Sequence, residues 1–203
     1  MISLYHSVFS RAFVALWMLE ELGVSFRIID TDIRARKNKA PGFLKINPLG
    51  LVPAIDDNGV IVTEIPAICL YLADQYSYGG LAPKIEDPIR GAYLKWMVFA
   101  TSVFEPAIDI FAAPDHKHAP RPQFDNRDGV IAMLDARLCA EPYLLGQNIS
   151  AADIALGGLF GIAFHNMRVP HLPSFIAYNE RLTSRPAQQR ASAKTWPTQQ
   201  FGN

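Results

Sequence analysis

Strand-like patterns occur only near the start of this sequence, and this limits the folds that it can adopt. Four short segments alternate or run apolar in the way that strands do: 2–6, 25–30, 52–56 and 60–63. An apolar helical pattern ending at Gly23 separates the first two, which predicts a β-α-β unit with parallel strands. Asp57-Asn58-Gly59 separates the last two and predicts an antiparallel hairpin. A helix over about 66–76 follows, so the expected order is β-α-β, an irregular link, then β-β-α.

After residue 87 the sequence carries only helical apolar patterns. They recur over four segments: 93–104, 130–138, 154–164 and 175–182. Before them, Ser77-Tyr78-Gly79-Gly80 marks a linker. The predicted fold class is therefore α+β, with a thioredoxin-like domain over 1–78, a linker over 79–86 and an all-α domain over 87–203.

The composition excludes several classes of partner. The chain of 203 residues is 50% hydrophobic, enough for a sizeable core, and its 19 basic and 19 acidic side chains balance. No segment concentrates basic residues into a stripe that could bind a phosphate backbone, and no apolar run approaches the length that a membrane helix needs. Neither nucleic acid nor membrane is therefore expected as a partner. Cys69 and Cys139 lie far apart without metal-binding spacing, which fits a reducing compartment and predicts a cytoplasmic protein.

Two segments together predict a site for a short peptide. The bond between Val52 and Pro53 enters an apolar strand, and a cis geometry there would turn the amide and carbonyl of Val52 outward. Such a backbone edge can pair with a peptide ligand. Glu64 stands at the start of the next predicted helix, whose first amides and positive dipole end can hold a carboxylate.

Several motifs agree in order and spacing with those of cytosolic glutathione S-transferases. They are Ser10 before the first helix, Leu16 to Gly23 within it, Phe43 to Gly50 leading into Val52-Pro53, Ala67 to Asp74, and Tyr143 to Gly146 followed by Ile149 to Ile154. The chain therefore resembles the glutathione S-transferase superfamily, as a bacterial-type member, over nearly its whole length. The resemblance implies a thioredoxin-like domain followed by an all-helical domain, in a homodimer.

The resemblance also implies a function. A glutathione transferase binds glutathione as co-substrate, stabilises its thiolate and conjugates it to an apolar electrophile, with no metal. Ser10 is the residue implied to support the thiolate. The implied glutathione-binding residues are Lys39, Val52, Pro53, Glu64 and, through its backbone amide, Ile65. Apolar residues implied to line the electrophile pocket, or else to fill the core, are Phe9, Phe104, Ile108 and Phe111.

Some assignments stay open at this point. Tyr5 and Ser7 are alternatives for the thiol contact, and Ser10 can also be read as a simple N-cap. Ile65 replaces the family's usual serine, and Val14 stands where related bacterial sequences often carry arginine. Losing a hydroxyl bond to a carboxylate costs roughly 1.5–3 kcal/mol. Basic side chains that compete with Lys39 are Arg34, Arg36 and Lys37.

The alternative functions follow from these departures. One is a catalytically weakened protein of the same fold that binds ligands or partners. The other is a glutathione-dependent peroxidase or disulfide reductase.

Two further patterns are interpreted as structural. Ser150 and Asp153 have the spacing of a reciprocal capping box, which predicts a role in stability. His116 and His118 lie two residues apart in a proline-rich loop without a third ligand, so we expect solvated loop residues and no metal site.

Overall fold

The computed structural model describes residues 1–108 and 127–197, and it divides into two compact units. The first unit contains Met1–Ser77 together with the chain from Thr183 onward, and the second contains Tyr78–Leu182. No helix within the described residues is long and apolar enough to cross a membrane.

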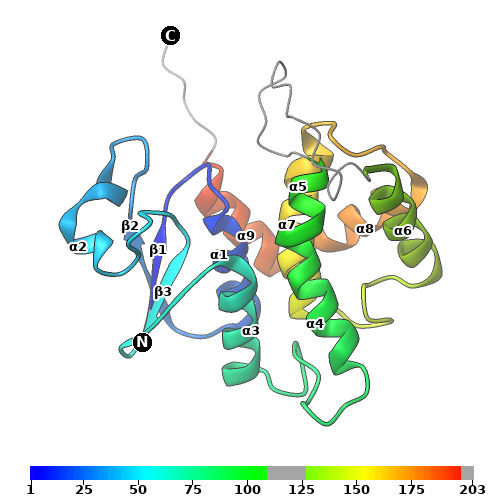
Figure 1. Ribbon diagram of the computed structural model, residues 1–203, viewed down its shortest axis with the longest axis horizontal. Coiled ribbons are helices and arrows are strands. Elements are labelled where there is room, and N and C mark those ends of the chain that lie inside the picture. The colour runs from blue at the N-terminus through cyan, green and yellow to red at the C-terminus, as the bar shows by residue number, and fades with distance from the viewer. Residues whose placement is uncertain (109–126, 198–203) are drawn as a thin grey trace. The chain divides into compact units, whose positions relative to one another are not determined.

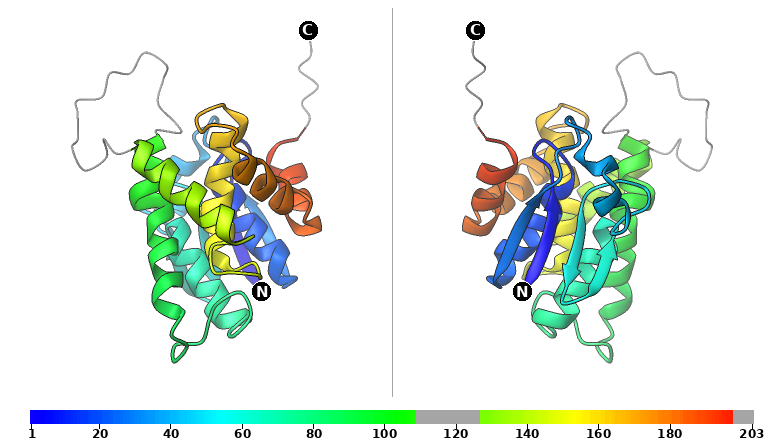
Figure 2. Two further views of the ribbon diagram at one scale, coloured as in Figure 1. Left: turned by 90° about the vertical axis from the view of Figure 1, so that its right-hand side faces the viewer. Right: turned by 90° about the vertical axis from the view of Figure 1, so that its left-hand side faces the viewer.

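The first unit is built on a four-stranded sheet with the order β2-β1-β3-β4 (Figure 2). Its strands are β1 (Ile2–His6), β2 (Phe26–Asp30), β3 (Ala54–Asp57) and β4 (Val60–Thr63). β1 pairs with β2 in parallel, while β3 runs antiparallel to both β1 and β4. The predicted thioredoxin-like order is confirmed.

The first long helix, α1 (Ala12–Leu22), packs against β1, α3 (Ile65–Tyr76) and α9 (Pro186–Thr195) (Figure 1). Because neighbours surround it, every residue from 12 to 19 is buried, which explains why its sequence is apolar on all faces. The helix ends at Gly23, whose φ of 65° is left-handed and whose amide donates to the carbonyl of Leu19 at 3.2 Å.

Helix α9 joins the first unit although it lies far along the chain. Glu20 of α1 pairs with Arg190 and Lys194, and Glu21 pairs with Arg185 just before α9. The predicted bounds 87–203 include these residues in the helical domain, because a helical pattern does not say which unit a helix packs against. Here the ion pairs and a buried face of small residues place α9 beside α1.

The second unit contains only helices among its named elements. They are α4 (Arg90–Phe99), a π-helical turn η2 (Ala100–Phe104), α5 (Glu105–Ile108), α6 (Arg127–Ala140), α7 (Ala151–His165) and α8 (Pro173–Thr183). Its core is aromatic: the ring of Phe160 contacts the rings of Phe104, Phe175 and Tyr178 at centroid distances of 6.1, 5.2 and 5.6 Å. The predicted all-α second domain is confirmed.

The capping box at the start of α7 is confirmed and is part of a larger network. Asp153 is fully buried. Its carboxylate accepts hydrogen bonds from the amide and hydroxyl of Ser150 at 2.9 and 2.8 Å, from the amide of Leu144 at 2.8 Å and from the hydroxyl of Tyr178 at 3.1 Å. One carboxylate thereby ties α7 to α8 and to the loop before α7.

Candidate functional site

The site residues predicted in the first unit lie along one edge of the sheet. Tyr5 of β1, Ala54 of β3 and Thr63 of β4 form one row of strand partners. β1 ends one residue beyond this row, β4 ends at it and β3 begins at it. The amide of Thr31, after β2, donates to the carbonyl of His6 at 2.8 Å and brings the end of β2 to the same edge. The segments that follow or precede these strand ends therefore meet here.

Val52 offers an open stretch of backbone at this edge. The Val52–Pro53 peptide bond is cis, and β3 does not begin until Ala54. The amide and carbonyl of Val52 make no hydrogen bond to another described residue. Both groups are therefore available to the backbone of a ligand.

Glu64 has an unusual conformation at the start of α3. Its φ of 69° is left-handed, which is uncommon outside glycine and is concentrated at functional sites. Its side chain is exposed and its carboxylate has no partner among the described residues. The carboxylate is thus free to bind a cation.

The first turn of α3 leaves backbone donors open. Its first hydrogen bond runs from the amide of Ile68 to the carbonyl of Glu64 at 2.9 Å, so the amides of Ile65 and Ala67 precede the bonded turns. The side chain of Ile65 is buried, at 5% exposed. Ile65 therefore contributes an amide but no hydroxyl to an anion at this helix end.

Ser10 uses its hydroxyl within the loop between β1 and α1. The hydroxyl donates to the carbonyl of Ser7 at 2.6 Å and accepts from the amide of Ala12 at 3.2 Å. Ser10 is half-buried, so it is also within reach of solvent. Its single proton must leave the carbonyl of Ser7 before it can be donated to a bound sulfur.

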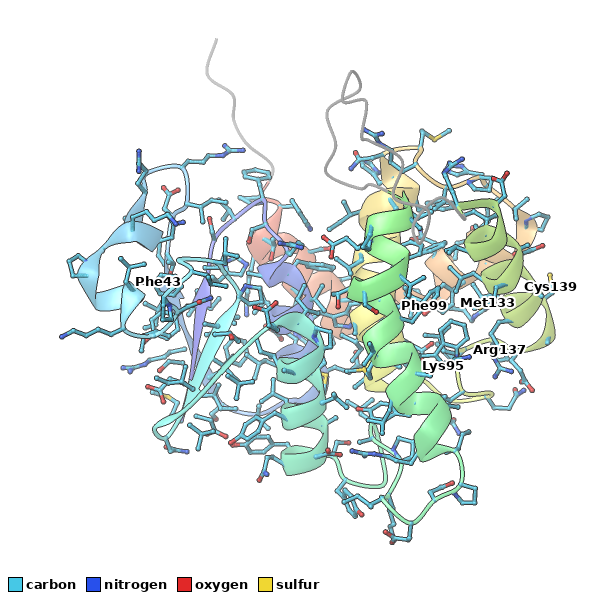
Figure 3. The ribbon with its side chains drawn as sticks, viewed as in Figure 1. Phe43, Lys95, Phe99, Met133, Arg137 and Cys139 are labelled. Carbon is cyan, nitrogen blue, oxygen red and sulfur yellow. The ribbon has the colours of Figure 1, made fainter. Side chains whose placement is uncertain are left out.

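Ser7 is more enclosed than Ser10, and Tyr5 is half-buried like Ser10. The Ser7 hydroxyl is buried, donates to the carbonyl of Val8 at 3.3 Å and accepts from the amide of Ile33 at 3.3 Å. The ring of Tyr5 packs against Phe43 of α2 (Pro41–Leu44), with centroids 5.4 Å apart; Phe43 is labelled in Figure 3. The burial of Ser7 favours Ser10 over Ser7 as the hydroxyl that a ligand can reach.

Lys39 lies in η1 (Lys37–Lys39), which is fastened to the turn before Val52. Its ammonium donates to the carbonyl of Leu49 at 3.2 Å, and buried Asn38 donates to the carbonyl of Gly50 at 2.7 Å. Gly50 has a φ of 63°, and a Cβ there would lie 2.8 Å from the Asn38 carbonyl oxygen. The close approach explains the glycine and places the Lys39 cation at the site edge.

Two of the competing basic residues, Lys37 and Arg34, have other partners. Lys37 pairs with Asp30, whose hydrogen bond and charge raise the pKa of the Lys37 ammonium. The Arg34 guanidinium lies 4.9 Å from the ring centroid of Phe9. Val14 is fully buried within α1.

The predicted electrophile-pocket residues have different surroundings. Phe9 is half-buried in the loop after β1, between Arg34 and Trp196. Phe104 is fully buried and Ile108 is 4% exposed, both within the helical unit. Phe111 lies outside the described residues, as do His116 and His118. The structure thus accounts for Phe104 as a member of the aromatic core around Phe160.

Neither cysteine is arranged as a nucleophile. Cys69 is fully buried, and burial raises the pKa of its thiol to about 12. Cys139 is exposed on α6, where its thiol lies 3.5 Å from a carboxylate oxygen of Asp135. Cys139 lies on α6 with Met133 and Arg137, and Lys95 and Phe99 lie on α4 (Figure 3).

The comparisons with known proteins agree with this geometry. Residues 1–74 match the family described as Glutathione S-transferase, N-terminal domain. Glutathione S-transferase F9 of Arabidopsis thaliana is 30% identical over 200 residues, which cover 89% of this chain and 91% of that protein. The chain belongs to the glutathione S-transferase family.

Solved structures extend this likeness to both units of the chain. A sphingomonad glutathione S-transferase complexed with glutathione is 30% identical, with a TM-score of 0.80 over 95% of this chain and 98% of that one. The theta class glutathione S-transferase of Xanthomonas axonopodis pv. citri, with glutathione bound, is 29% identical, with a TM-score of 0.79 over 94% and 96% of the two chains.

Sequence reasoning missed one group of neighbours of the candidate site. Thr195 and Trp196, at the end of α9, contact the loop that carries Ser10. The isolated tryptophan was the only available signal, and a lone aromatic near a chain end does not name its partner. The contact became visible only in the folded chain.

Proposed function

We propose that this protein binds glutathione at the sheet edge and transfers its thiolate to an apolar electrophile. The observation that carries the proposal is the convergence of open groups at that edge: the Val52 backbone, the first amides of α3 and the Glu64 carboxylate. A zwitterionic tripeptide has complementary groups for each of them. Membership of the family and the glutathione bound to similar solved structures support the same ligand.

Each part of glutathione then has a partner. The backbone of the cysteinyl residue pairs with Val52, as an added strand does. The γ-glutamyl ammonium pairs with Glu64, and its carboxylate accepts from the amides of Ile65 and Ala67 at the positive end of α3. Lys39 pairs with the glycyl carboxylate. These roles place the sulfur toward the loop that carries Ser10.

Ser10 supports the thiolate in this proposal. The thiol loses its proton to solvent, and the Ser10 hydroxyl turns from the Ser7 carbonyl to donate to the sulfur anion. The sulfur then forms a bond to the electrophilic carbon. In a substitution the leaving group departs with its bonding electrons, and in an addition the π-electron pair moves to the neighbouring atom. A bond to the anion and the nearby helix end together lower the thiol pKa by about one to two units.

The identity of residue 65 gives the first test. Isothermal titration with glutathione compares the native chain with Ile65→Ser, which restores a hydroxyl beside the α3 amides. We expect the native chain to bind in the micromolar to low millimolar range and the variant to bind about tenfold more tightly or better. Absence of binding by the native chain, with binding restored in the variant, would refute the proposal and favour the ligand-binding or partner-binding alternative.

The reaction type is tested separately. Activity with an aromatic halide but not with a hydroperoxide supports the transferase, and the reverse supports the glutathione-dependent peroxidase.

The proposal includes a cytoplasmic homodimer, and exposed Leu94 and Val98, one turn apart on α4, offer apolar surface for association. Light scattering at several protein concentrations tests the dimer.

A further inference from the structure

The end of α9 holds the loop between β1 and α1 by several contacts. The amide of Phe9 donates to the carbonyl of Thr195 at 3.0 Å. The Trp196 ring contacts the rings of Phe9 and Phe13 at centroid distances of 5.8 and 6.1 Å. Behind the loop, the His6 Nε2 and Thr195 Oγ1 atoms share a buried hydrogen bond of 2.9 Å.

Phe9 needs such support because its backbone is in an uncommon conformation. Its φ of 53° is left-handed, and bulky residues persist there only where the surroundings hold them. Trp196 contacts its ring, and the Arg34 guanidinium lies 4.9 Å from the ring centroid. The amide is fixed as well, so both the side chain and the backbone of Phe9 are held.

The conformation of Phe9 decides where Ser10 points. Ser10 follows Phe9 directly, and its hydroxyl closes a short turn onto the carbonyl of Ser7 at 2.6 Å. A change of φ at Phe9 would swing Ser10 away from both Ser7 and the first amides of α1. By holding Phe9, Thr195 and Trp196 therefore also fix the position of the next residue, Ser10.

We propose that Trp196 and Thr195, through its carbonyl, are positioning residues, which hold Phe9 left-handed and thereby keep Ser10 where its hydroxyl can turn from the Ser7 carbonyl to the glutathione sulfur. The role at the sulfur rests on the proposed function, whereas the hold on Phe9 does not. We call these contacts, from Thr195 and Trp196 to Phe9 and Phe13, the α9 clasp.

The clasp is separable from the anchoring of α9. The helix is fixed to α1 by the ion pairs of Glu20 with Arg190 and Lys194, which lie before the clasp in sequence. Arg190→Gln weakens this anchor without touching Phe9. It is therefore the matched control for substitutions of Trp196.

The experiment compares the native chain with Trp196→Ala, Trp196→Phe and Arg190→Gln. Amide hydrogen exchange reports the hold on Phe9 without any ligand. The ultraviolet absorbance of the thiolate, followed against pH with glutathione bound, reports the thiol pKa at the site. Charged and titratable side chains around the loop stay unchanged in all Trp196 variants: His6, Arg11, Asp30, Asp32 and Arg34.

In Trp196→Ala we expect the Phe9 amide to exchange about tenfold faster or more and the bound thiol pKa to rise by about one unit, which is tenfold less thiolate at a given pH. Trp196→Phe keeps a ring against Phe9 and should restore most of both values. Arg190→Gln should resemble the native chain in the exchange rate of the Phe9 amide and in the pKa of the bound thiol. Where Trp196→Ala does not fold, Trp196→Leu keeps apolar volume and removes the ring.

The inference is overturned by an unchanged Phe9 exchange rate in Trp196→Ala, or by a bound thiol pKa equal to that of the native chain. Equal effects of Arg190→Gln and Trp196→Ala also overturn it, because they would reflect general loosening of α9. If the native chain binds no glutathione, the proposed function fails together with the role at the sulfur. The exchange of Phe9 then still decides whether the clasp exists.

Discussion

Ser10 serves two purposes at the residue scale. It accepts from the Ala12 amide at the start of α1 and donates to the Ser7 carbonyl. The first contact caps the amide of Ala12 although the N-cap residue itself is Arg11, and the second holds the proton that the proposed mechanism needs. One hydroxyl therefore links the stability of a helix end to the chemistry of a thiolate.

Ser10→Ala removes both contacts. We expect kcat/KM with glutathione and an electrophile to fall about 10- to 100-fold, since one to two units of thiol pKa are lost. Chemical unfolding should show a loss of about 1 kcal/mol from the missing cap. Ser7→Ala is the comparison, because the carbonyl of Ser7 and not its hydroxyl contacts Ser10. Unchanged turnover in Ser10→Ala, or a larger loss in Ser7→Ala, would contradict the assignment.

His6 predicts how stability depends on pH. It is 4% exposed, and burial lowers its pKa from 6.5 to about 4, although the charge of Asp30 opposes this shift. The folded state therefore favours neutral imidazole, while the unfolded chain takes up a proton near pH 6.5. The stability contributed by His6 is complete above pH 6.5 and is lost as the pH falls from 6.5 toward 4.

From pH 7 to pH 5 this linkage should remove about 2 kcal/mol of unfolding free energy. Urea unfolding of the native chain and of His6→Gln at both pH values measures it. The glutamine keeps a polar partner for Thr195 and does not titrate. Between pH 7 and pH 5 the His6→Gln variant should therefore lose about 2 kcal/mol less unfolding free energy than the native chain. Equal losses in the two proteins would show that His6 is not the group responsible.

At the scale of elements, α7 depends on one buried carboxylate. Asp153 accepts from Ser150, Leu144 and Tyr178, so it fixes the start of α7 to the preceding loop and to α8. Its partners would stay buried and unsatisfied without it. A short capping motif thus stabilises contacts among three segments of the helical unit.

Asp153→Ala should lower the unfolding free energy by roughly 2–5 kcal/mol, because several buried donors lose their acceptor. The proposed glutathione-binding residues belong to the other unit, so the dissociation constant of glutathione should stay within about twofold. Denaturant unfolding and calorimetric titration of the same preparation measure the two values. A large change in affinity with little change in stability would point to a role beyond packing.

At the scale of the whole molecule, local patterns predicted most of the fold. The individual strands and helices, the hairpin at Asp57-Asn58-Gly59 and the box of Ser150 with Asp153 each depend on residues a few positions apart. The open groups at Val52 and Glu64 were predicted for the same reason, since a peptide bond and a helix start are local features. Spacing along the chain is sufficient information for all of these.

The sequence by itself determined the family, the two kinds of domain and the segments that form the candidate site. Only the tertiary structure decided that α9 packs beside α1, that Phe104 fills an aromatic core, and that the Ser10 hydroxyl already has partners. His6 and Thr195 are 189 positions apart and share a buried hydrogen bond. Such a contact depends on the packing of whole elements, and no periodicity or motif specifies which distant side chain will pack against a given residue.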